Sequence, residues 1–164
     1  MKNNNFKILS LFLGLMVSVF AFVACGDDDS DDDFTSGQYA GNRIVGEWVW
    51  GQRDMPQEER QHHTQGYIFK ANGEVSYYST WSEENYASEE GKQGTYTVDG
   101  IKLRFHWTKS VMKENGETHA EDIDEMEDVE IMYPEEGNDD MFLKRYYVVE
   151  GRQGWTEEGP FYKK

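Results

Sequence analysis

Two pairs of turn residues, Asn72-Gly73 and Asp99-Gly100, constrain what this chain can fold into more than any other feature. Each is a dipeptide that a two-residue type I′ turn favours, because both central positions of that turn need a positive φ. Asn72-Gly73 joins residues 66–71 to 74–81, and Asp99-Gly100 joins residues 94–98 to 101–107. We therefore predict two β-hairpins of adjacent antiparallel strands.

The segment 101–107 indicates how these strands are buried. Its apolar residues occupy every second position, with basic residues between them, and the apolar set is Ile101, Leu103, Phe105 and Trp107. Since successive side chains of a strand point to opposite faces, the pattern predicts one buried face and one face in water.

Four more segments have the pattern of short strands, and no strong amphipathic helix competes with them. They are residues 44–50, 129–133, 141–149 and 160–163. With the two hairpins they make eight antiparallel strands, which protect their edges best by closing on themselves. The predicted fold is all-β, an antiparallel up-and-down eight-stranded β-barrel over residues 43–164.

Gly46-Glu47-Trp48 on the first strand resembles the Gly-x-Trp motif of lipocalins, and residues 69–75 followed by 94–98 resemble small bacterial lipocalin-like domains. The resemblance implies a lipocalin-like barrel in which Trp48 plugs the closed end near a basic residue, with Arg145 and Arg152 as candidates. It also implies that the connection 51–65 is a lid over the open end. A bulge glycine and a core tryptophan in another β-meander would look the same.

The first 24 residues have the pattern of a secretory signal peptide, in which Lys2 and Lys7 precede an apolar run that ends at Ala24. The next residue, Cys25, is the only cysteine in the chain. Residues 22–25, Phe-Val-Ala-Cys, resemble the lipobox of bacterial lipoproteins, with Phe22 where leucine is usual. That resemblance implies cleavage before Cys25 and acylation of its sulfur, for example with palmitate. Two or three acyl chains would anchor the protein to a membrane without a spanning helix.

Residues 25–42 form the predicted lipid-anchored flexible tether, because an acidic run at 26–33 has no apolar periodicity. Acidic residues directly after an acylated cysteine resemble the signal that exports some Gram-negative lipoproteins to the cell surface. The expected location is therefore the cell envelope, on the exposed face of the outer membrane, with the periplasmic leaflet as the alternative. The run lacks the glycine and the final glutamate of an EF-hand loop, so we expect no calcium site.

Charge narrows the range of partners. Without residues 1–24 the chain has 14 Lys and Arg against 32 Asp and Glu, a formal charge of −18. A surface of that sign repels nucleic acid and anionic headgroups, so we expect no nucleic-acid partner. We expect a monomer that meets the membrane through its lipid.

Eight aromatic side chains fall on faces that the alternation turns inward, and they are the candidate ligand-binding set: Trp48, Tyr67, Phe69, Tyr77, Trp81, Tyr96, Phe105 and Trp107. An eight-stranded barrel is either filled by side chains or holds one small molecule. Two functions follow, and both stay open. The barrel binds a small hydrophobic or aromatic molecule, or it is filled and acts as an envelope interaction module that binds a protein or glycan through its loops.

The long connections 51–65 and 108–128 are predicted to be a lid and a solvated acidic loop. The carboxylates of the second have no apolar surroundings that would raise a pKa for acid or base catalysis. Adjacent His62 and His63 point apart in an extended chain and lack a second pair of metal ligands. The sequence also contains no nucleophile-elbow, phosphate-loop or zincin motif. We therefore expect no catalysis, no cofactor and no metal.

Overall fold

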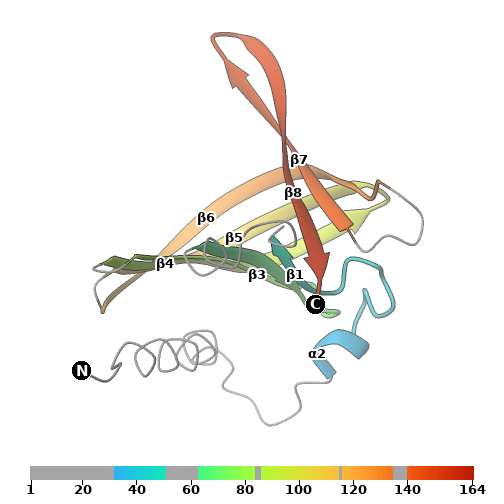
Figure 1. Cartoon of the computed structure of the whole chain (residues 1–164). Helices are drawn as coiled ribbons and strands as arrows, with labels where there is room; N and C mark the ends of the chain where they lie inside the picture. The colour runs from blue at the N-terminus through green and yellow to red at the C-terminus, as the bar shows by residue number, and fades with distance from the viewer. Residues whose placement is uncertain (1–31, 51–62, 84–85, 115, 135–139) are drawn as a thin grey trace. The chain divides into compact units, whose positions relative to one another are not determined.

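The computed structural model describes residues 32–50, 63–83, 86–114, 116–134 and 140–164. These residues form a closed antiparallel barrel in which each strand pairs with the next and β8 pairs with β1 (Figure 1). The strands are β1 (Gly46–Trp50), β2 (His63–Phe69), β3 (Glu74–Glu83), β4 (Tyr86–Asp99), β5 (Lys102–Glu114), β6 (Glu117–Met132), β7 (Asp140–Val149) and β8 (Arg152–Lys163). A four-residue helix, α2 (Asp32–Thr35), precedes them. The predicted eight-stranded up-and-down barrel is confirmed.

Both predicted hairpins form, but their turns differ from the two-residue type I′ geometry. In the first, the Gly73 amide donates to the Lys70 carbonyl at 3.1 Å and Gly73 has a φ of 96°. The amide of Lys70 also donates to the carbonyl of Glu74 at 2.9 Å, so three residues make the loop. This is the longer hairpin connection, in which glycine occupies the left-handed position.

The second turn lies one residue further along than predicted. Asp99 pairs with Lys102, so Gly100 and Ile101 are the two turn residues. Ile101 is therefore 59% exposed, and its predicted burial is wrong. The other three apolar residues of that face, Leu103, Phe105 and Trp107, are buried as predicted.

The predicted loop 108–128 is also wrong, because β5 and β6 run through it as one long hairpin that turns after Glu114. Acidic residues of β6 face basic residues on the neighbouring strand. Asp128 accepts from Arg104 at 2.5 Å, and His106 Nε2 lies 2.7 Å from Asp124 Oδ1. Cross-strand pairs of opposite charge stabilise a sheet that water reaches on both faces. A strand in such a sheet has no buried face, so its sequence lacks the apolar alternation by which strands are predicted.

Three other strands begin at least three residues before their predicted starts. β4 begins at Tyr86, β8 begins at Arg152, and β2 begins at His63, inside the predicted lid 51–65. The rest of that lid, residues 51–62 with His62, lies outside the described residues, as do the signal segment, Cys25 and most of the acidic run.

Trp48 fills one end of the barrel, which we call the closed end. It is fully buried, and its indole Nε1 donates to the Ile44 carbonyl at 2.7 Å. The basic group above its ring is Lys163, whose Nζ lies 5.5 Å from the ring centroid. Neither predicted candidate takes that place, because Arg145 points into the barrel's cavity and Arg152 begins β8 at the far end of the β7–β8 hairpin.

The residues before β1 also pack on the closed end, although the sequence assigns residues up to 42 to the tether. The Tyr39 amide donates to the Ala71 carbonyl at 2.9 Å, and its ring stacks on Tyr96 at 4.8 Å. Gly37 allows the close approach, since a Cβ at that position would lie 2.4 Å from the Ala71 carbonyl oxygen. The packed domain therefore begins before residue 43.

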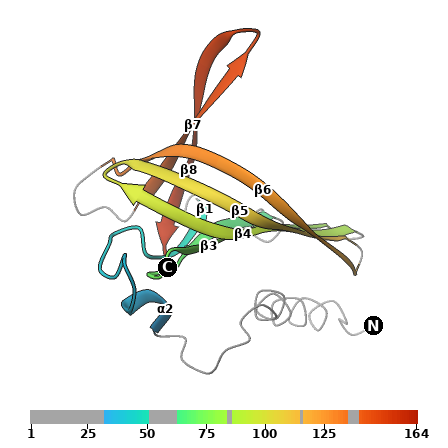
Figure 2. The same ribbon diagram turned by 180° about the vertical axis from the view of Figure 1, so that it is seen from behind.

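The contact between β6 and β7 is short. Residues 129–132 of β6 pair with residues 142–145 of β7, whereas β7 and β8 pair with each other as far as Val149 and Arg152. Beyond Arg145 the β7–β8 hairpin leaves the sheet that β3 to β6 form (Figures 1 and 2). The barrel is thus closed at one end and open between β6 and β7 at the other.

We expect Phe105→Ala to lower the free energy of unfolding by about 3–5 kcal/mol, because it removes a fully buried ring from the core. The matched control, Ile101→Ala, removes an exposed side chain only four residues away and should cost less than about 0.5 kcal/mol. Urea unfolding followed by circular dichroism measures both. Equal losses would contradict the observed position of the second turn.

Candidate functional site

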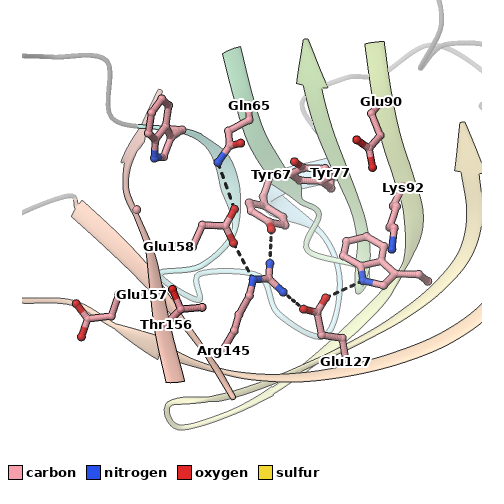
Figure 3. Close-up of a pocket in the computed structure, with 13 residues that line it drawn as sticks. Gln65, Tyr67, Tyr77, Glu90, Lys92, Glu127, Arg145, Thr156, Glu157 and Glu158 are labelled. Carbon is pink, nitrogen blue, oxygen red and sulfur yellow. Dashed lines mark hydrogen bonds and ion pairs between the residues drawn. The ribbon is translucent and has the colours of Figure 1, made fainter. Parts of the chain in front are cut away.

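A cavity of about 660 Å³ occupies the open end of the barrel (Figure 3). Every strand contributes to its wall. The lining residues are Trp50, Gln65, Tyr67, Tyr77, Glu90, Lys92, Trp107, Glu127, Arg145, Thr156, Glu157, Glu158 and Gly159. Aromatic rings and charged groups therefore share one space.

Arg145 is the central polar group of the cavity. Its Nη2 donates to the Tyr67 hydroxyl at 2.6 Å, and its Nε donates to Glu158 Oε2 at 2.8 Å. Its Nη1 forms an ion pair with Glu127 (Figure 3). We call these four residues the Arg145 cluster; they join β2, β6, β7 and β8.

The two carboxylates of the cluster have further partners. Glu127 Oε2 accepts from the Trp107 indole at 3.1 Å, and Glu158 Oε1 accepts from the Gln65 amide at 3.2 Å. Each carboxylate thus uses both oxygens. Partly buried charges are tolerated when they are paired and hydrogen-bonded in this way.

The cluster shifts the pKa values of Arg145 and Tyr67. Burial alone would lower the pKa of Arg145, but Tyr67 and Glu158 outweigh it and hold that pKa above its ordinary value, so the guanidinium stays charged. Burial, and then the charge of Glu158, raise the pKa of Tyr67 far above its ordinary value of 10.0. The phenol is therefore neutral and accepts the hydrogen bond from Arg145.

Seven of the eight predicted aromatic residues fall into two groups. Tyr67, Tyr77 and Trp107 line the cavity. Four others belong to the packed interior, where all are buried: Trp48, Phe69, Tyr96 and Phe105. The Phe69 ring contacts those of Tyr96 and Phe105, and Tyr67 stacks on Phe105 with ring centroids 5.8 Å apart. The Trp48 ring lies against that of Tyr133. The barrel is thus filled at its closed end and hollow at its open end, and a ligand role for the three lining residues stays a prediction.

Trp81 lies outside this interior and is 42% exposed. Its ring lies 5.5 Å from that of His63, which lies 5.5 Å from Trp50 on the other side. His63 Nε2 is 3.3 Å from the Ser79 hydroxyl. Within the described ranges, no three His, Cys, Asp or Glu side chains gather as metal ligands.

Most of the polar wall could not be predicted from the sequence. Glu127 lies in a segment expected to be a loop, Glu158 precedes the expected eighth strand, and Trp50 is not among the aromatic residues predicted to point inward. The sequence predicts Arg145 only as a candidate neighbour of Trp48. The one available signal was the alternation of Met141, Leu143 and Arg145, which places the arginine on the inward face of β7.

Charged groups of both signs line the site. Its two best-buried carboxylates, Glu127 and Glu158, both pair with the Arg145 guanidinium. The lining carries four glutamates against one arginine and one lysine, and that lysine, Lys92, already pairs with Glu125 at 2.7 Å.

Among the described residues, no helix has the length and apolar character needed to cross a membrane.

The raised pKa of Tyr67 gives a test at alkaline pH. Above pH 10 the unfolded chain loses the Tyr67 proton while the folded chain keeps it, so stability falls as pH rises. Tyr67→Phe removes this one proton, and stability should then fall less steeply, by about 1.4 kcal/mol per pH unit. Urea unfolding of both proteins at pH 9, 10 and 11 measures the slopes. Parallel curves would show that Tyr67 is not protected in the fold.

Comparison of the chain with protein-family models, with curated proteins and with solved structures found no match. The antiparallel eight-stranded barrel is compatible with a lipocalin-like fold.

Proposed function

We propose that this protein binds one small hydrophobic or aromatic molecule in the open end of its barrel. The cavity is the observation that supports the proposal most directly. Its volume of about 660 Å³ lies within the range of small-molecule sites, roughly 300–1,000 Å³, and aromatic rings alternate in its wall with fixed polar groups. Trp50, Tyr67, Tyr77 and Trp107 would contact the apolar body of the ligand.

The charges of the wall select among such ligands. Arg145 donates to three partners within the protein and offers no free fork to an anionic group. The exposed carboxylates of Glu90 and Glu157 stand at the rim. A neutral or cationic aromatic molecule is therefore preferred to an anionic one, since aromatic faces also attract cations.

A neutral fluorescent probe, N-phenyl-1-naphthylamine, tests the cavity. Thr156→Trp would fill the space with an indole from an exposed position of β8 without disturbing the core, and should weaken probe binding at least about tenfold, or 1.4 kcal/mol. Gln153→Trp, on the same strand beyond the cavity, is the matched control and should bind as the wild type does.

Titration of each protein with the probe, followed by its emission and by quenching of tryptophan fluorescence, gives the dissociation constants. Absence of saturable binding to the wild type, or equal binding by both variants, would contradict a ligand site in this cavity.

We further propose that the barrel is held in the cell envelope by lipid on Cys25, with the outer face of the outer membrane as its location. The support is the lipobox-like Phe22-Val23-Ala24-Cys25 after an apolar segment, and the acidic run behind it. The packed domain begins near Tyr39, at the closed end of the barrel.

Cys25→Ser tests the anchor. In a bacterial host the wild-type chain should begin at Cys25 and incorporate labelled palmitate, whereas Cys25→Ser should keep residues 1–24 and incorporate none. Intact mass and radiolabelling measure this, with Ser30→Ala as a control that should be processed normally. Normal cleavage of Cys25→Ser and release of the product would instead indicate an ordinary signal peptide.

A further inference from the structure

β6 has an unpaired edge along most of its length. It pairs with β5 from Glu117 to Glu130, but with β7 only over residues 129–132. Among the described strands, residues 117–128 have no neighbour on their second side. In Figures 1 and 2, β6 forms the border of the long sheet there, because the β7–β8 hairpin has turned away. Such an edge offers a row of backbone amides and carbonyls to another strand.

The charge of β6 determines what could pair with that edge. The strand has eight carboxylates and neither lysine nor arginine. β5 opposes them with four lysine and arginine residues, one histidine and one glutamate, so the β5–β6 hairpin keeps a large negative excess. A second copy of β6 would bring eight more carboxylates against the first, and like charges across a strand pair are destabilising. The edge therefore disfavours self-pairing and favours a basic segment.

The β7–β8 hairpin adds exposed apolar side chains near the end of this edge, where the Tyr146 hydroxyl donates to Glu130 of β6 at 3.0 Å. Five of the ten exposed large hydrophobic side chains among the described residues belong to it: Tyr146, Tyr147, Val148, Val149 and Trp155. Tyr146 pairs across the hairpin with Trp155, and Lys144 lies 4.5 Å from the Trp155 ring. Because alternate residues of a strand point to opposite faces, Tyr146, Val148 and Trp155 share one face of the hairpin and the other two share the second face. Exposed apolar side chains that share a face indicate an interaction site, and a two-stranded hairpin beyond a barrel has little of its own to stabilise it.

From these observations we propose that the open edge of β6 binds an extended basic segment of a partner protein as an added β-strand. Backbone hydrogen bonds to residues 117–128 give the affinity, basic side chains meet the carboxylates of β6, and apolar side chains contact the β7–β8 hairpin. This surface meets the cavity at Glu127, but binding at the edge needs no ligand in the cavity, so the inference extends the proposed function and does not depend on it.

A peptide of about eight residues with alternating lysine and valine is the probe, because its extended form places the two kinds of side chain on opposite faces. The full-length protein in a mild non-ionic detergent is titrated with the fluorescein-labelled peptide at about 0.15 M salt, and anisotropy gives the dissociation constant. The same peptide with N-methyl groups on alternate residues keeps its charge, but along one edge of the extended peptide its backbone amides can no longer donate hydrogen bonds. We expect it to bind at least about tenfold more weakly.

Two Glu→Lys variants locate the site. Glu121→Lys reverses an exposed charge on the open part of β6 and should weaken binding about tenfold. Glu74→Lys makes the same exchange at the closed end and should leave binding unchanged. Amide hydrogen exchange on the wild type should slow along residues 117–128 when the peptide is bound.

Three results would overturn the proposal. Equal binding of the plain and N-methylated peptides, or equal losses in the two variants, would mean diffuse attraction to an acidic protein. Protection of β6 that appears with rising protein concentration in the absence of peptide would mean that a second copy is the occupant. Thr156→Trp should bind the peptide normally, so failure of the cavity and failure of the edge are distinguishable.

Discussion

The Arg145 cluster is the interaction on which the open half of this barrel depends. Only four residue pairs join β6 to β7, so the backbone ladder closes the barrel weakly at that point. Arg145 lies at the end of the ladder and links Glu127 on β6, Glu158 on β8 and Tyr67 on β2. A guanidinium is suited to this position because its planar fork can satisfy three partners in fixed directions. The Arg145 cluster mainly specifies how the four strands are arranged, because a partly buried ion pair gains little net stability after desolvation.

The general fold could be predicted because its signals are local. Turn residues, alternation in residues 101–107 and short apolar segments were enough to indicate eight strands and a barrel. The outer half of β5 and β6 could not be found in the same way, because water reaches both faces there and neither face needs apolar residues. The position of the turn between β4 and β5 could not be predicted from the sequence either, because a shift of one residue at Gly100 depends on how the two strands pair along their whole length. Ile101 was misplaced for that reason.

The site shows a similar division. Inward aromatic residues could be predicted from alternation, but their depth could not, because depth depends on how far each strand extends past the packed interior. Trp81 lies on β3 beyond that interior and is exposed, while Tyr67 on β2 lies at its boundary. The Arg145 cluster brings together residues from four strands, and only the registers of those strands make them neighbours. No spacing of residues in the sequence indicates that the members of the Arg145 cluster are neighbours.

The opening of the cavity and the free edge of β6 have one structural cause. If β7 had followed β6 to its beginning at Glu117, residues 117–128 of β6, which pair only with β5 among the described strands, would have a second neighbour and the wall would continue around the open end. The departure of β7 and β8 after Arg145 removes that wall, which leaves the cavity accessible and the edge exposed together. Glu127 belongs to both the cavity and the edge, since it lines the cavity and lies on β6 two residues before the pairing with β7 begins at Val129. A strand added to β6 would therefore lie next to the cavity entrance, where it could restrict the passage of a ligand.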